Sequence, residues 1–546
     1  MCAIWIYLIK DDDNIDGKDL NDIYKKFQSL SGRGPDNYNF SVIDNKIIIG
    51  FHRLSIMDVS KKGNQPFRYL NDETEYICIC NGEIYNADKI KKELKYDFTS
   101  FSDCEVLIPL YLKYGKNMYK YLDGVFSFVI VELKNNYYNV LACRDRIGVR
   151  PAFIGYNNNN GSLAISSEVK GLLNLFDNIE VFPPGKYLNF SSTCDTTFTY
   201  ETYYEFKYKY NKLPFSSNIL LDIKNKFTDA VRKRLITDRP LCALLSGGLD
   251  SSLVCSIASR LLKECGQKLY TFSIGMPGSP DNMYAKKVAD FIGSVHTVVN
   301  INNAEALSAI KDVVWATETF DITTIRASTG QYLISKYISE NTNFKVVLSG
   351  DGSDELTSGY LYNYNCPNHD DLHNEAVKRI KEIHLYDSLR ADRATCIHGL
   401  ELRVPFLDYK FIDYYLSINP ELRQPTSDCM EKYLLRKSFE GYLPNEVLWR
   451  QKEAFSDGIS SQEDSWYKTI QNHVENRFSE KDLLEAKINF SHCSPTTKES
   501  LYFRNMFNKL FGNKYSNVIP NMWMPMWSNT DDPSARTIKN IYKNNI

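Results

Sequence analysis

The sequence predicts an α/β protein of two domains, and three observations carry this prediction. The chain has 546 residues, which is more than one ordinary domain contains. Residues 2–200 hold short β-branched or aromatic runs between turn residues, a pattern typical of strands. From residue 219 onward apolar strands alternate with helical patterns. This alternation indicates a parallel sheet with its ligand sites at the carboxyl ends of the strands.

The first domain, residues 2–200, is expected to consist mainly of strands. These strands are predicted at residues 47–51, 76–80, 125–132, 137–143 and 163–166. Helical patterns interrupt them at about residues 86–94 and 105–113. Cys78 and Cys80 are two apart in one strand, so both are expected on one face as small core residues.

The second domain, residues 219–546, follows a polar and aperiodic linker at residues 201–218. Its strands are predicted at residues 241–245, 269–274 and 345–348. Apolar positions between residues 253 and 262 trace one side of a helix after the first strand, and a helix after the second strand ends near Gly293.

Composition and charge exclude several classes of function. The chain carries 65 basic and 67 acidic side chains, a net charge of −2, which gives no electrostatic reason to expect a nucleic-acid partner. No apolar run approaches the roughly 18 residues of a membrane helix. Thirteen scattered cysteines are typical of reduced thiols, and the apolar start at residues 2–9 lacks a basic leader. We therefore expect a cytoplasmic protein without a membrane partner.

A Gly-rich turn at residues 246–252, SGGLDSS, follows a predicted strand and opens a helix. Gly247 and Gly248 let the backbone approach a phosphate group, and successive amides at a helix start bind anions. The hydroxyl donors are Ser246, Ser251 and Ser252. Asp250 is a candidate ligand for the Mg²⁺ that accompanies a polyphosphate. No lysine follows the glycines, so this turn is not a Walker loop.

This turn resembles the pyrophosphate-binding loop of the PP-loop ATPases, which cleave ATP to AMP and pyrophosphate. A second turn at residues 349–355, SGDGSDE, ends another predicted strand. Paired with the first loop, it supplies Ser349 and Gly350 as candidate contacts to ATP and Asp354 as a second candidate Mg²⁺ ligand.

Cys2 would become the N-terminal residue once Met1 is removed, so that its thiol and a free α-amine share one residue. An amine with a pKa near ~8 is a usable base for that thiol. A cysteine at position 2 means little alone, but four further segments follow it in order. They are Arg33-Gly34-Pro35-Asp36, Phe51-His52-Arg53-Leu54, Asn81-Gly82-Glu83 and Ser102-Asp103.

Together these segments resemble a class II glutamine amidotransferase of the N-terminal-nucleophile hydrolase type, which implies an αββα sandwich. The resemblance makes Cys2 the nucleophile that forms a thioester with glutamine, and Asn81 with Gly82 the oxyanion hole. It implies that Arg53 pairs with the glutamine carboxylate and that Glu83 and Asp103 hold its amine, roles that suit their charges. The remaining glutamine-binding residues are then Leu54, Ser55, Ile56 and Met57.

The order of a glutaminase and a PP-loop domain resembles the asparagine synthetase family over essentially the whole chain. Four strings carry the resemblance, at residues 320–328, 399–408, 449–458 and 531–534. It implies that L-aspartate and ATP form β-aspartyl-AMP and pyrophosphate, and that ammonia from L-glutamine converts this intermediate into asparagine. Leu244 and Ile274 are then expected to contact adenosine, and Lys452 to stabilise charge on the phosphates.

The chain departs from this family's pattern at two catalytic positions. Ala3 replaces the glycine of the family's Cys-Gly-Ile start, and Asp351 replaces a glutamate in the second Ser-Gly turn. The family's carboxylate at this second position is linked to formation of the acyl-adenylate. Both departures put the reaction rates in question without affecting the fold.

Other interpretations remain open at the level of sequence. A relative that amidates or cyclises another carboxylate, as β-lactam synthetase does, would share both domains, although Cys2 and an intact glutamine pocket weigh against cyclisation. A degenerate protein that only senses ligands would explain Ala3 and Asp351. The oligomeric state is also open, with a homodimer among the alternatives.

Two further patterns have simpler explanations than function. His369 and His373 are four apart, as in some zinc sites, but a solvated helix start explains them better. The basic run Arg232, Lys233 and Arg234 lacks an aromatic set for stacking bases and is expected to be a solvated helix face.

Overall fold

A computed structural model describes residues 1–9, 19–135, 137–159, 161–193, 198–206, 209–452, 459–460, 465–528, 530 and 532–534. Parts of two predicted family strings, residues 453–458 and 531, lie outside the described residues. The chain forms two compact units. The first comprises residues 1–205, 237–239 and 396–401, and the second comprises residues 206–236, 240–395 and 402–546. Within the described ranges, no helix is long and apolar enough to cross a membrane.

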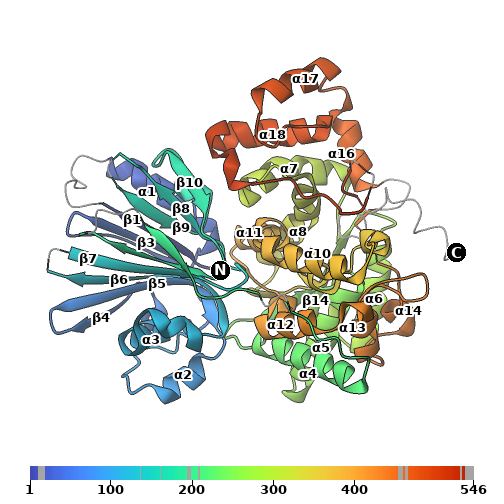
Figure 1. The fold of residues 1–546 in the computed structure, drawn as a ribbon, viewed down its shortest axis with the longest axis horizontal. Coiled ribbons are helices and arrows are strands. Elements are labelled where there is room, and N and C mark those ends of the chain that lie inside the picture. The colour runs from blue at the N-terminus through green and yellow to red at the C-terminus, as the bar shows by residue number, and fades with distance from the viewer. Residues whose placement is uncertain are drawn as a thin grey trace. The chain divides into compact units, whose positions relative to one another are not determined.

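The first unit contains two six-stranded sheets whose neighbouring strands are all antiparallel (Figure 1). In spatial order, the first sheet consists of β10 (Asn178–Val181), β8 (Phe153–Tyr156), β9 (Leu163–Ser166), β1 (Ala3–Leu8), β3 (Ile47–Arg53) and β2 (Asn37–Ile43). The second consists of β12 (Thr199–Thr202), β11 (Lys186–Ser191), β7 (Tyr137–Arg144), β6 (Gly124–Lys134), β5 (Thr74–Ile84) and β4 (Phe67–Asn71).

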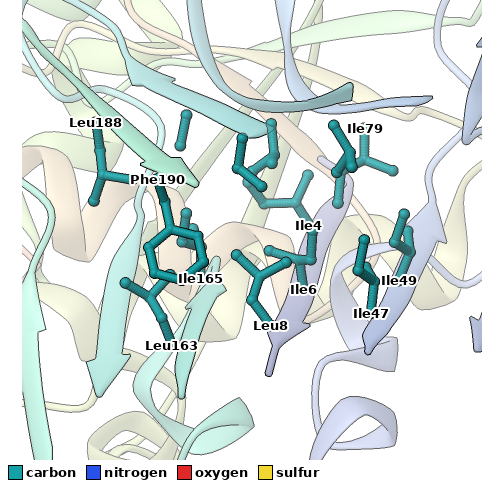
Figure 2. Close-up of a cluster of buried hydrophobic side chains, with 14 of the residues drawn as sticks. Ile4, Ile6, Leu8, Ile47, Ile49, Ile79, Leu163, Ile165, Leu188 and Phe190 are labelled. Atoms are coloured by element: carbon teal, nitrogen blue, oxygen red, sulfur yellow. The ribbon is translucent and has the colours of Figure 1, made fainter. Parts of the chain in front are cut away.

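The main core of this unit lies between its two sheets. Alternate residues of β1 point into it, among them Ile4 and Ile6, and they meet Ile79 of the second sheet (Figure 2). Side chains alternate across a strand, so one face of β1 can be buried in this layer while the other packs outward. This period of two fixes which residues of β1 face the second sheet.

Helices cover the outer faces of both sheets. On the first sheet, α1 (Leu20–Gln28) places Phe27 against Trp5 and stacks it on the His52 ring at a centroid distance of 4.1 Å. On the second sheet, α2 (Ala87–Glu93) and α3 (Leu107–Tyr114) bury a separate apolar cluster. This order of layers confirms the predicted αββα sandwich. The sequence reasoning missed α1, which begins at an Asp19 cap and is held by Ile23 and Phe27.

The second unit is built on a sheet with the order β15 (Val295–Asn300), β14 (Tyr270–Gly275), β13 (Leu241–Leu244), β16 (Val346–Leu348) and β17 (Glu401–Arg403). The first four strands pair in parallel, which confirms the predicted parallel α/β fold. Its described helices are α4 (Ser217–Lys233), α5 (Leu249–Glu264), α6 (Pro280–Ile292), α7 (Asn303–Thr317), α8 (Ile322–Asn341), α9 (Ser353–Thr357), α10 (His369–Glu382), α11 (Asp387–Cys396), α12 (Tyr409–Ser417), α13 (Tyr433–Ser438), α14 (Asn445–Leu448), α16 (Trp466–Glu475), α17 (Glu480–Asn489) and α18 (Lys498–Phe511).

The expectation of a solvated basic run at the end of α4 is wrong for Arg234. Arg232 is exposed and pairs with Asp229, as expected. Lys233 and Arg234, however, both pair with Asp408, at 2.5 Å and 3.1 Å, and the Arg234 side chain is buried. The buried carboxylate of Asp408 explains why this turn of the helix faces inward.

The expectation of a solvated helix start is also wrong for His373 of α10. Its side chain is buried, and Nδ1 accepts a hydrogen bond from Nη2 of Arg423 at 2.9 Å. Burial lowers the pKa of His373 to about 4, and the nearby Arg423 charge acts in the same direction. His369 is partly exposed, and no group of three or more potential metal ligands occurs among the described residues.

Candidate active sites

The predicted phosphate loop lies between β13 and α5 of the second unit. Gly247 has φ +75°, and a Cβ there would approach the backbone nitrogen of Ala285 to 2.4 Å, so only glycine fits. The hydroxyl groups of Ser246 and Ser251 form a hydrogen bond of 2.9 Å, and the Gly248 amide donates to Ser246 Oγ at 3.3 Å. The loop is therefore a tight turn that opens a helix, as the motif predicts.

The second Ser-Gly turn lies directly against the first. It follows β16, and a Cβ on Gly350 would lie 2.6 Å from the Ser251 amide nitrogen. Both turns line a cavity of about 170 Å³ in the second unit. The predicted residues that line it are Leu244, Ser246, Gly248, Asp250, Ser251, Ile274, Ser349, Gly350, Asp351, Asp354 and Lys452. Gly247 and Ser252 are not among its lining residues, and Ser252 is fully buried.

Two carboxylates and two lysines meet in the wall of this cavity. Lys432 Nζ lies 2.7 Å from both oxygens of Asp250 and 2.5 Å from Oδ1 of Asp354. Lys452 Nζ lies 2.6 Å from Oδ2 of Asp354 and 3.8 Å from Oδ2 of Asp250. Burial alone would raise the pKa of Asp354, but the two ammonium groups outweigh it and hold that pKa well below its usual range.

Asp351 is held in the same cavity by two partners. Oδ1 accepts from Arg390 Nη2 at 2.8 Å, and Oδ2 accepts from the hydroxyl of Ser349. Arg390 also binds Asp387 at 3.0 Å and Gln331 at 2.9 Å. The carboxylate that replaces the family's glutamate therefore has a fixed position.

In the first unit, Cys2 directly precedes β1. Its thiol donates to the carbonyl oxygen of Leu54 at 3.6 Å, and its own carbonyl oxygen accepts from Arg33 Nε at 3.0 Å. With Met1 in place, burial raises the pKa of the Cys2 thiol to about 11. A thiol with this pKa is almost entirely protonated at neutral pH, so it needs a base to act as a nucleophile.

Ala3, one residue further, lies in ordinary extended backbone. It is the first residue of β1, is fully buried, and pairs with His52 of β3. It is absent from the residues with positive φ in the described chain. This position therefore needs no glycine for its backbone conformation.

Arg53 organises the loop that follows β3. Its Nη1 donates to the Ser60 carbonyl oxygen at 2.8 Å and to Oδ1 of Asn64 at 2.6 Å. Its Nη2 donates to the carbonyl oxygen of Asp58, and a Cβ on Gly63 would lie 2.4 Å from Nη2. Burial lowers the pKa of Arg53, and the nearby Cys2 opposes this shift, so the two groups interact electrostatically.

The loop residues Leu54, Ser55, Ile56 and Met57 are placed by backbone contacts. The Ser55 amide donates to Oδ2 of Asp36 at 2.8 Å, and the Ile56 carbonyl accepts from the Asp238 amide at 3.2 Å. The Met57 carbonyl accepts from Arg53 Nη2 at 3.5 Å. Leu54 supplies the carbonyl that faces the Cys2 thiol, so this segment lies beside the candidate nucleophile.

Strand β5 carries Asn81, Gly82 and Glu83 in succession. Both side-chain polar atoms of Asn81 are buried and have no hydrogen-bond partner in the described structure. An unpaired buried amide is costly, and such groups are often found where a ligand completes them. A Cβ on Gly82 would lie 2.4 Å from the Val125 carbonyl oxygen, so glycine is required there. Asp103 is buried and accepts from the Ile84 amide at 2.6 Å.

Family comparisons cover both units. The Asparagine synthase family profile matches residues 222–370 and 363–530, and the Glutamine amidotransferase domain profile matches residues 1–206. The glutamine-hydrolysing asparagine synthetase of Gallus gallus is 40% identical over 584 residues, which cover 100% of both chains. The chain belongs to the glutamine-hydrolysing asparagine synthetases.

Two further relatives also match this chain over nearly its whole length. The asparagine synthetase of Homo sapiens is 41% identical over 566 residues and covers 98% of each chain. A probable asparagine synthetase of Acanthamoeba polyphaga mimivirus is 38% identical over 558 residues, which cover 98% of this chain and 99% of that protein. These matches support ATP-dependent synthesis of asparagine from aspartate with glutamine as nitrogen source, which confirms the predicted activity and ligase class.

Several residues that line the cavity were not singled out from sequence. They are Gln331, Glu355, Tyr360, Asp387, Arg390 and Lys432. Neither Lys432 nor Arg390 carried a sequence signal, because charged residues are common on and beside helices and the burial of these two is visible only in the structure.

Proposed function

We propose that Cys2, once Met1 is removed, attacks the side-chain amide carbon of L-glutamine. The thiol proton passes to the α-amine of Cys2, a thioester forms, and the amide nitrogen leaves as ammonia. Water then hydrolyses the thioester to glutamate. The buried and unpaired amide of Asn81 supports a role for this side chain, together with Gly82, in binding the oxyanion.

In the same proposal, Arg53 binds the α-carboxylate of glutamine, and Glu83 and Asp103 bind its α-amine. The loop of Leu54 to Met57 completes this pocket. The hydrogen bonds of Arg53 to loop carbonyls mean that part of its donor capacity is already used. Because Nη1 and Nη2 both donate to the loop, bidentate binding of the carboxylate requires at least one of these donors to turn from the loop to the substrate.

We propose that the cavity of the second unit binds ATP and L-aspartate. The β-carboxylate of aspartate attacks the α-phosphorus of ATP, which gives β-aspartyl-AMP and releases pyrophosphate. Ammonia then attacks the acyl carbon, AMP leaves, and asparagine forms. The meeting of Asp250, Asp354 and Lys452 in one cavity is the observation that carries this proposal. Lys452 faces the phosphates, and Leu244 and Ile274 face adenosine.

Magnesium fits the donors of this site. Oxygen atoms of Asp250 and Asp354 both contact the ammonium group of Lys432, so the two carboxylates lie close together. Mg²⁺ prefers carboxylate oxygens together with phosphate oxygens. When bound, Mg²⁺ would neutralise negative charge on the triphosphate. The residues that would hold it are Asp250 and Asp354.

We further propose that the protein acts in the cytoplasm on three small-molecule substrates, with neither a nucleic-acid nor a membrane partner. Twelve described cysteines are free, which is consistent with a reducing compartment. A homodimer is the oligomeric state we would test first, by light scattering.

The experiment that tests the proposed reaction measures pyrophosphate release from ATP, with aspartate and with other carboxylic acids in its place. Aspartate should support release, and mass spectrometry should identify asparagine and AMP when glutamine is added. Release with another acid and not with aspartate would favour the relative that modifies a different carboxylate. A protein that binds ATP and releases no pyrophosphate with any acid would be a sensor.

A further inference from the structure

Lys432 bridges the two carboxylates that we assign to Mg²⁺. Its ammonium contacts three of their four oxygens within 2.7 Å, and its side chain is only 1% exposed. Ser353 Oγ donates to Oδ1 of Asp250 at 2.7 Å and fixes that carboxylate from another side. The lysine therefore sets how the two carboxylates are placed with respect to each other.

The backbone around Lys432 is adapted to this contact. Lys432 has φ 61° and ψ 26° at the start of α13, in the left-handed region that residues with a Cβ adopt rarely. A Cβ on Gly359 would lie 2.0 Å from Lys432 Cε and 2.3 Å from Oδ1 of Asp354. An unusual backbone conformation and a required glycine thus both serve the position of one side chain.

The residue before Lys432 ties this contact to the other lysine. The Glu431 side chain is fully buried and pairs with Arg436 at 2.6 Å. Its Oε1 also accepts from the backbone amide of Lys452 at 3.0 Å, and its Oε2 accepts from the hydroxyl of Tyr364 at 2.8 Å. The Glu431 carboxylate therefore links the backbone of Lys452 to the segment that carries Lys432.

The charges of this group determine what it can bind. Two carboxylates and two ammonium groups cancel, so a divalent cation alone would leave an excess of positive charge in a largely buried site. The cation would also need the oxygens that Lys432 contacts. When the cation binds together with ATP, the negative charge of the triphosphate offsets the charge of the cation, and no excess of positive charge remains.

We propose that Lys432 is a positioning residue that makes divalent-cation binding at Asp250 and Asp354 depend on ATP. It fixes the two carboxylates and competes with the cation for their oxygens. This inference rests on the proposed assignment of Asp250 and Asp354 as the magnesium ligands.

Binding of Mn²⁺ alone to the purified full chain, followed by the EPR signal of free Mn²⁺, tests this role. The native chain should bind Mn²⁺ weakly, and Lys432→Met should bind it at least tenfold more tightly. Lys432→Arg keeps the charge and should behave like the native chain. Lys437→Met is the matched control, because Lys437 lies in the helix that Lys432 caps but pairs with Glu440 at 2.8 Å. Equal Mn²⁺ affinity of the native chain and Lys432→Met would overturn the proposal.

Addition of a non-hydrolysable ATP analogue to the native chain gives a test that needs no variant. Mn²⁺ affinity should rise at least tenfold with the analogue, and an unchanged affinity would contradict the proposal even if Lys432→Met failed to fold. Pyrophosphate release by the native chain with aspartate separates this inference from the proposed reaction. If pyrophosphate is released but Mn²⁺ affinity does not depend on the ATP analogue, the proposed role of Lys432 is refuted and the proposed reaction stands. If no pyrophosphate is released, the proposed reaction is refuted.

Discussion

Asp351 and Arg390 form an ion pair in the wall of the synthetase cavity, with Arg390 Nη2 2.8 Å from Oδ1 of Asp351. This pair lies where the chain departs from its family, which has a glutamate in place of Asp351. A carboxylate that is one methylene shorter is drawn back by roughly 1 Å, and such a shift can cost on the order of 100-fold when positioning drives the reaction. Arg390 and Ser349 fix the shorter side chain and so define where its oxygens lie.

Asp351→Asn should eliminate asparagine synthesis and leave glutaminase activity in place, because the amide cannot replace the charge. Asp351→Glu should give an equal or faster rate, since it restores the family's side chain. Both variants are assayed with ammonium as nitrogen source, which keeps the first unit out of the measurement. Asparagine synthesis by Asp351→Asn at the parental rate would leave this carboxylate without a catalytic role.

Cys2→Ala should abolish glutamine-dependent synthesis and preserve synthesis from added ammonium. The reason is that the proposed chemistry of the second unit uses no thiol. The measurement is the rate of asparagine formation with each nitrogen source, with glutamate release followed in parallel. Loss of both activities together would show that the two reactions are not divided as proposed.

Ala3→Gly should change glutaminase turnover by less than about tenfold, which corresponds to ~1.4 kcal/mol. Ala3 is already in extended backbone, so glycine relieves no strain, and it should destabilise the strand by about 0.5–1 kcal/mol. Glutamate release and thermal unfolding measure the two effects. A gain of several orders of magnitude would mean that Ala3 displaces the nucleophile.

Gly359→Ala should lower adenylation and the stability of the second unit, because its Cβ would overlap Lys432 and Asp354. Overpacking of this kind typically costs about 1–3 kcal/mol. Pyrophosphate release with aspartate and the thermal unfolding midpoint report the outcome, and glutaminase activity should persist. Gly266→Ala is the control for backbone strain alone, since Gly266 has positive φ and no atom within 4 Å of the added Cβ, whereas Gly359 is not among the glycines with positive φ. A loss of stability in Gly359→Ala no larger than that in Gly266→Ala would mean that overlap with Lys432 and Asp354 has no measurable cost.

Local motifs made the loops of both sites predictable, because their chemistry depends on residues adjacent in sequence. The turn after β13 needs Gly247 for its left-handed backbone, and that requirement is visible in the sequence. The strands β3, β5 and β6 were likewise predicted from short apolar runs. Helix α1 was missed because its apolar face is short.

The contacts of Arg390 and Lys432 could not be predicted, because they join segments far apart in the chain. Lys432 meets Asp250 across 182 positions of sequence, and the helix that Lys432 caps, α13, packs against the distant α4. The burial of His373 and Arg234 depends in the same way on distant partners, Arg423 and Asp408. Residue type and spacing carry no information about such partners.

Transfer of nitrogen from glutamine to asparagine tests the central claim most directly. The chain is supplied with glutamine labelled with ¹⁵N in its side-chain amide, together with aspartate, ATP and Mg²⁺. We predict that the label appears in the side-chain amide of asparagine, with one AMP and one pyrophosphate formed for each asparagine. Release of the label as ammonium with no labelled asparagine would contradict this account.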